Sequence, residues 1–137
     1  MPGAFFVPGA PPGGYARRMT TTTLFLLRPD FDDAAFGPGK FYCPHCVALE
    51  GLLATYPSLR HEIAVRYVDF PRPRPAVIAE IGEANQSCPV LVLGANEASR
   101  PDLPASARRA ENGRVFFVGE KDIGSYFAVR FGIARSH

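Results

Sequence analysis

The sequence is short of cysteine, of long apolar runs and of net charge, and each shortage excludes a class of protein. Three cysteines in 137 residues are too few for the disulfide framework of a small secreted protein. No stretch reaches the roughly 20 consecutive apolar residues of a membrane-spanning helix. The net charge is only +2 and the arginines are scattered, so we expect no nucleic-acid partner. We therefore expect a cytoplasmic protein in a reducing compartment, without a membrane partner.

The N-terminal segment differs in composition from the rest of the chain. Residues 1–14 are rich in proline and glycine and contain one short apolar cluster, at 5–7. The segment lacks the basic start and the apolar run of about 7 to 15 residues that mark a signal peptide. We expect residues 1–19 to be a disordered extension and residues 20–137 to form one domain.

The tetrapeptide Cys43-Pro44-His45-Cys46 stands at the start of a segment with helical periodicity. Two sulfurs three residues apart at a helix start can form a disulfide across the first turn. The unpaired N–H groups and the helix dipole favour the thiolate of Cys43, which is therefore the predicted nucleophile, with Cys46 as the resolving thiol. Pro44 suits the first helical position, and a protonated His45 adds positive charge near the thiolate.

Other interpretations of this cysteine pair remain open. A CxxC pair is half of many zinc sites, although the sequence offers no second pair at matching spacing. The metal alternative is a zinc or iron–sulfur site on Cys43, Cys46 and Cys88, with a fourth ligand from solvent, a small thiol or a histidine. His61 and His137 are candidates only by residue type. A third interpretation is that the pair carries no chemistry.

Strand-like and helical patterns alternate along the chain and predict an α/β domain. We expect strands at 21–27, 63–70, 90–93 and 115–118, and helices following the cysteine pair, around 77–81 and after Gly119. The first two strands should run parallel across the first helix. That arrangement puts the dithiol at the carboxyl end of the first strand, where the ligand sites of open α/β sheets gather.

Two segments are predicted to be loops. Residues 29–42 are rich in turn formers, and residues 94–114 form a polar insertion that ends in an Asn112-Gly113 turn signal. Arg72 and Arg74 lie in a proline-rich link, where we expect solvated charges that an acidic partner could also engage.

The order of elements from about residue 20 to 134, with its Cys-Pro-His-Cys tetrapeptide and its Cys88-Pro89 before a strand, resembles the thioredoxin superfamily. The chain is most similar to a bacterial thioredoxin-like family described as a domain of unknown function. The resemblance implies a thioredoxin-like α/β fold with a central mixed four-stranded sheet and about three flanking helices. It also implies a thiol-disulfide oxidoreductase without a bound cofactor, acting on a protein partner or glutathione as a monomer or homodimer.

The resemblance further implies roles for residues around the dithiol. Pro89 corresponds to a cis-proline whose loop binds an extended substrate backbone, with Cys88 beside it and Val90 offering backbone hydrogen bonds. Tyr42 stands where thioredoxins carry tryptophan. Asp122 resembles the acidic residue with which glutaredoxins hold the glutathione amino group, and a helix cap explains it equally well.

The sequence departs from the superfamily pattern in ways that keep further alternatives open. The residue before the cis-proline is normally not cysteine, so Cys88 is a buried apolar thiol, an extra redox partner or a metal ligand. The first strands carry no buried acid to take the proton of Cys46. A third hypothesis is a non-catalytic adaptor that binds a partner through residues 94–114.

Overall fold

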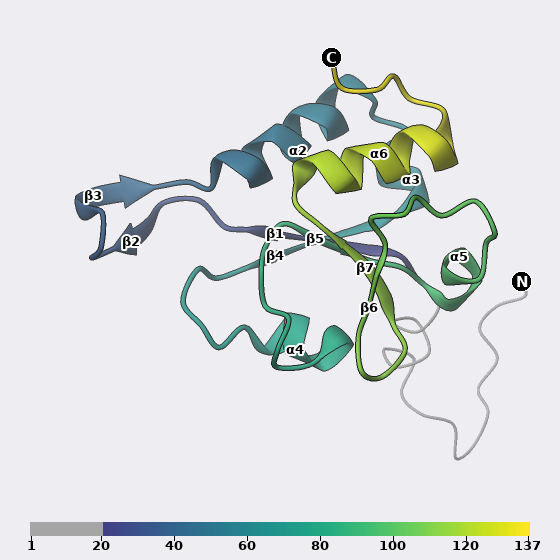
Figure 1. Cartoon of the computed structure of the whole chain (residues 1–137). Coiled ribbons are helices and arrows are strands. Elements are labelled where there is room, and N and C mark those ends of the chain that lie inside the picture. The colour runs from purple at the N-terminus through teal and green to yellow at the C-terminus, as the bar shows by residue number, and fades with distance from the viewer. Residues whose placement is uncertain (1–20) are drawn as a thin grey trace, which may run out of the picture.

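A five-stranded mixed sheet runs through residues 21–137, the part of the chain that the computed structural model describes (Figure 1). The predicted N-terminal extension, residues 1–19, lies outside that part. The strands follow the order β4-β1-β5-β7-β6; β1 and β4 run parallel, and the other neighbours run antiparallel. Their bounds are Thr23–Leu27 for β1, Ala64–Val68 for β4, Val90–Val92 for β5, Arg108–Arg109 for β6 and Val115–Val118 for β7.

Helices cover both faces of this sheet. The helices α2 (Pro44–Thr55) and α6 (Glu120–Phe131) lie side by side on one face, and α4 (Pro75–Ile81) lies on the other (Figure 1). Two single-turn helices, α3 (Leu59–Glu62) and α5 (Ala95–Ala98), lie in the connections. Because β1 is covered on both faces, all five of its residues are buried, which explains why its sequence is a continuous run and not an alternating one.

The four predicted strands and three predicted helices are present, but the predicted count of four strands is wrong. The fifth strand, β6, lies in the segment 94–114, which was predicted to be a loop. It consists of two exposed arginines that pair with β7 at the edge of the sheet. A strand without apolar or β-branched residues leaves no pattern in the sequence, so only its pairing identifies it. The predicted turn before β7 is confirmed, with Gly113 at φ +87°.

The segment 29–42 is also more regular than predicted. It contains a separate hairpin of β2 (Phe31–Asp33) and β3 (Gly37–Phe41), which projects from the body of the protein (Figure 1). Gly37 and Gly39 both have φ above +100°, a region that favours glycine. Because β3 therefore contains glycines, which are typical of turns, its sequence was predicted to be a loop. The ring of Phe31 stacks on that of Phe70, with centroids 4.3 Å apart, and fixes the hairpin to the end of β4.

A buried ion pair connects α4 to the turn between β6 and β7. Arg114 Nη1 lies 3.0 Å from Glu80 Oε2, and the two side chains are only 10% and 5% exposed. Asn112 Nδ2 donates to the backbone carbonyl of Glu80 at 2.9 Å. The helix on one face of the sheet is therefore bound to the edge hairpin by charged as well as neutral hydrogen bonds.

Candidate functional site

The cysteine pair lies at the start of α2, as predicted. Cys43 is the residue before the first helical turn, with an extended backbone (φ −81°, ψ 115°), and Pro44 is the first helical residue. The backbone N–H of Cys46 donates to Cys43 Sγ at 3.3 Å. The sulfur therefore takes the place of the side-chain oxygen that usually caps a helix, and it accepts from one of the N–H groups that the helix leaves unpaired.

Cys46 is the inner thiol of the pair. Its side chain is 3% exposed, and the backbone N–H of Leu27 donates to its sulfur at 3.4 Å. This contact places the dithiol at the carboxyl end of β1, where the parallel arrangement of β1 and β4 predicted it. Burial raises the pKa of the Cys46 thiol far above its usual range, against the opposing effect of the Leu27 hydrogen bond. Cys46 is therefore protonated at neutral pH.

Cys88 is a third thiol near the pair. The Cys88–Pro89 peptide bond is cis, which confirms the expectation from the resemblance, and Gly119 N–H donates to the Pro89 carbonyl at 3.1 Å. Burial raises the pKa of the Cys88 thiol to about 11, while the positive charge of Arg74 opposes the rise and negative charge at Cys43 adds to it. All three cysteines are free thiols in this structure.

Arg74 was predicted to be a solvated charge in the proline-rich link, and this prediction is wrong. It is only 6% exposed, whereas Arg72 remains exposed. Its guanidinium donates to the carbonyl oxygens of Phe70 (Nε, 3.0 Å) and Gln86 (Nη1, 2.7 Å). The local sequence is only prolines and arginines, so no pattern in it shows that the chain folds back at Gln86 and covers this side chain.

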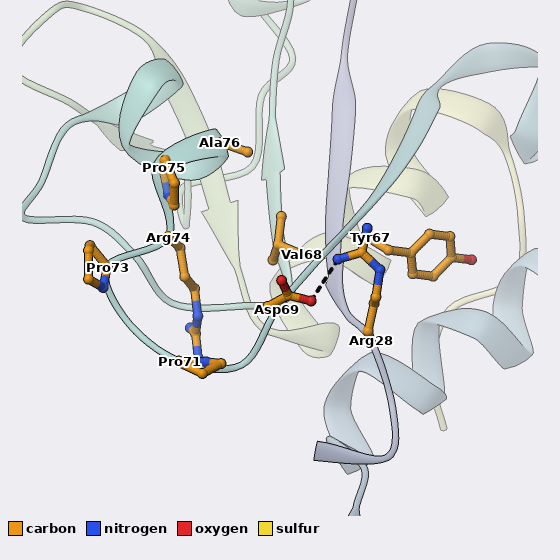
Figure 2. Close-up of a pocket in the computed structure, with 9 residues that line it drawn as sticks. All are labelled: Arg28, Tyr67, Val68, Asp69, Pro71, Pro73, Arg74, Pro75 and Ala76. Carbon is orange, nitrogen blue, oxygen red and sulfur yellow. Dashed lines mark hydrogen bonds and ion pairs between the residues drawn. The ribbon is translucent and has the colours of Figure 1, made fainter. Parts of the chain in front are cut away.

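A cavity of about 390 Å³ opens beside Arg74, at the carboxyl ends of β1 and β4. Figure 2 shows Arg74 and the prolines of the link along one wall, and Arg28 with Asp69 along the other. Arg28 Nη1 and Asp69 Oδ1 form an exposed ion pair at 2.8 Å. None of the three cysteines lines this cavity.

His45 contacts the other helix on the same face of the sheet. Its Nδ1 lies 2.8 Å from Oε2 of Glu120, the first residue of α6. The side chain of His45 is 61% exposed, so this contact joins the starts of α2 and α6 at the protein surface. Sequence reasoning missed Glu120. The only signal for it was an acidic residue at a predicted helix start, which is too common to single out.

The remaining predicted residues lie at different depths. Tyr42 precedes the dithiol and is 60% exposed. Val90 is fully buried inside β5, with β1 on one side and β7 on the other. Asp122 lies in the first turn of α6, close in sequence to Glu120. The structure thus places Tyr42, His45 and the thiols around the start of α2, and it holds Val90 within the sheet.

The ligand set of the metal alternative is not assembled in residues 21–137. No group of three or more His, Cys, Asp and Glu side chains in this range is placed to hold a metal ion. His61 and His137 therefore do not join the cysteines.

None of the helices described in the structure is long and apolar enough to cross a membrane.

Comparison with known proteins identifies the family of the chain. The family described as "Protein of unknown function (DUF3088)" matches residues 21–135. The chain belongs to this family. The DUF3088 match runs from the residues before β1 to beyond α6 and so includes the dithiol, Arg74 and the cis-proline. No curated protein and no solved structure matches.

Proposed function

We propose that this DUF3088 protein is a thiol-disulfide oxidoreductase whose redox pair is Cys43 and Cys46. The observation that carries the proposal is the hydrogen bond from the Cys46 N–H to Cys43 Sγ at the start of α2. The half-buried sulfur of Cys43 lies at the N–H groups that the helix start leaves unpaired. The sulfur of Cys46 lies one turn further into the helix and is almost fully buried. An accessible nucleophile backed by an inner resolving thiol is the arrangement that disulfide exchange requires.

The reaction proceeds in two exchanges. The Cys43 thiolate attacks one sulfur of a partner disulfide, forms a mixed disulfide and releases the other partner sulfur as a thiolate, which takes a proton from solvent. Cys46 then loses its proton and attacks Cys43 Sγ, so that the mixed disulfide breaks and the second partner thiolate leaves. The protein ends with a Cys43–Cys46 disulfide and the partner gains two electrons. The reverse sequence oxidises a partner dithiol.

The arrangement of elements supports a thioredoxin-like fold as part of this proposal. A parallel pair, β1 and β4, is joined through α2, and the antiparallel strands β5 and β7 continue the sheet. The edge strand β6 and the β2–β3 hairpin are additions to the four-stranded arrangement. The proposed partner is a protein disulfide or glutathione in the cytoplasm, with Pro89 and Tyr42 beside the exchanging sulfur and Asp122 as a candidate contact for glutathione.

Selective alkylation of the reduced protein tests the proposal. We expect Cys43 to react fastest at neutral pH, because burial keeps Cys46 and Cys88 protonated there. The rate at Cys88 should rise about tenfold per pH unit until the pH approaches about 11, the pKa of that thiol. The measurement is the alkylation rate against pH, with each cysteine resolved by peptide mapping.

The control is the same protein in denaturant, where the three thiols should react alike. Equal rates at the three cysteines of the folded protein would contradict the proposed division of roles, and so would a faster reaction at Cys88 than at Cys43.

A further inference from the structure

Arg74 is a buried positive charge that donates to two backbone carbonyls and lies within hydrogen-bond reach of the Cys88 thiol. Its guanidinium donates to the carbonyl oxygens of Phe70 and Gln86. No ion pair found between residues 21 and 137 includes it. A buried charge is costly unless an opposite charge lies nearby, so the groups that face Arg74 matter for its role.

The groups that act on it most strongly are the three thiols and one further arginine, while Asp69, which is paired with Arg28, lines the same cavity as Arg74. Burial lowers the pKa of the Arg74 guanidinium, and negative charge at Cys88, Cys46 and Cys43, in that order, acts to raise it. The adjacent Arg72, which is exposed, acts against it as a like charge. The groups of opposite sign that act most strongly on Arg74 are therefore the sulfurs of the proposed site.

The guanidinium is also fixed relative to the segment that carries the third thiol. Gln86 lies two residues before Cys88, and its carbonyl accepts from Arg74 Nη1. The Gln86 side-chain oxygen accepts from the backbone N–H of Arg74 at 2.8 Å. These two bonds join the start of α4 to the segment that leads to Cys88 and the cis-proline.

We propose that Arg74 is a positioning residue for disulfide exchange: its buried guanidinium, fixed on Phe70 and Gln86, stabilises negative sulfur among Cys43, Cys46 and Cys88. The inference rests on the proposed function. In each exchange one S–S bond forms and another breaks, the attacking thiol loses its proton to solvent, and the leaving sulfur departs as a thiolate. Arg74 transfers neither protons nor electrons. It supplies a fixed charge where the low local dielectric strengthens its effect.

Three variants of the full chain test this role through the pH profile of Cys88 alkylation. Arg74→Gln removes the buried charge, and Arg74→Lys keeps the charge without the planar guanidinium. Arg72→Gln is the matched control, because it removes an exposed charge two residues away that acts on Cys88 in the same direction as Arg74 but more weakly. We expect Arg74→Gln to slow alkylation of Cys88 roughly tenfold at a given pH, equivalent to an upward shift of about one pH unit. Arg74→Lys should stay within about threefold of the wild type, and Arg72→Gln within about twofold, since solvent screens an exposed charge.

A second readout is the rate at which Cys43 exchanges with a small aromatic disulfide, which should fall at least about threefold in Arg74→Gln. A folded Arg74→Gln protein with an unchanged Cys88 profile or an unchanged exchange rate would overturn the role, as would an equal effect of Arg72→Gln. If circular dichroism shows that Arg74→Gln is unfolded, Arg74→Lys decides: a retained profile supports the charge role, and a tenfold slower reaction overturns it. Alkylation of Cys88 needs no disulfide substrate, so a failure of this inference is distinguishable from a failure of the proposed exchange activity.

Discussion

Replacing Cys43 with serine should abolish thiol-disulfide exchange, with a loss on the order of a thousandfold or more, because the nucleophile is removed. Replacing Cys46 should act differently. The Cys46→Ser protein keeps the Cys43 sulfur that accepts from the backbone N–H of residue 46, so it attacks a disulfide, but it lacks the thiol that resolves the product. We therefore expect it to accumulate a mixed disulfide. The measurements are the exchange rate with a small aromatic disulfide and the intact mass of the products.

Cys88→Ser provides the matched control, since it removes a third sulfur that is not part of the exchanging pair. We expect it to keep exchange within about tenfold of the wild type, with the remaining effect reflecting the proximity of Cys88 to Cys43 and Arg74. Full exchange activity in Cys43→Ser would contradict the assignment of the nucleophile. A mixed disulfide located by peptide mapping at Cys88 of the Cys46→Ser protein would contradict it as well.

Glu80→Ala should destabilise the fold by about 3–5 kcal/mol, because it leaves the buried Arg114 without its carboxylate. The pair is 3.0 Å long, and both side chains are at most 10% exposed. The bond from Asn112 Nδ2 to the backbone carbonyl at position 80 would remain, so α4 would keep one of its links to the turn that follows β6. The measurement is the free energy of unfolding from denaturant titration.

Asp69→Ala is the control for Glu80→Ala, because it removes the carboxylate of an ion pair of similar length on the protein surface. The Arg28–Asp69 pair is 2.8 Å long, with side chains 57% and 77% exposed. Surface pairs of this kind contribute less than about 1 kcal/mol. If the two variants lose the same free energy of unfolding, burial does not explain how much the Glu80–Arg114 pair contributes to stability.

The parts of the fold that follow from short-range patterns were predictable from the sequence. Helix α2 has a cysteine as its cap, a proline at its first position and apolar residues at helical spacing, so its start was known to within a residue. The apolar run of β1 and the following helix fixed the parallel pairing with β4. The location of the dithiol at the carboxyl end of β1 followed from these elements.

The parts that depend on pairing across the chain were not predictable. Strand β6 is two arginines whose strand conformation comes from β7, and β3 has glycines at positive φ within a strand. Arg74 is buried because Gln86 and Phe70 offer carbonyl oxygens to it. Glu120 meets His45 across 75 residues of sequence. None of these features leaves a periodic signal in the sequence.

The most direct test of the proposed function is equilibration of the wild-type protein in glutathione redox buffers, followed by acid quenching and peptide mapping of its disulfides. We expect one reversible two-electron transition, in which the Cys43–Cys46 disulfide forms while Cys88 stays reduced. A tenfold change in the equilibrium constant of such a couple corresponds to about 30 mV. If Cys43 and Cys46 stay reduced throughout, or if the disulfide that forms joins other cysteines, the protein does not use this pair for disulfide exchange.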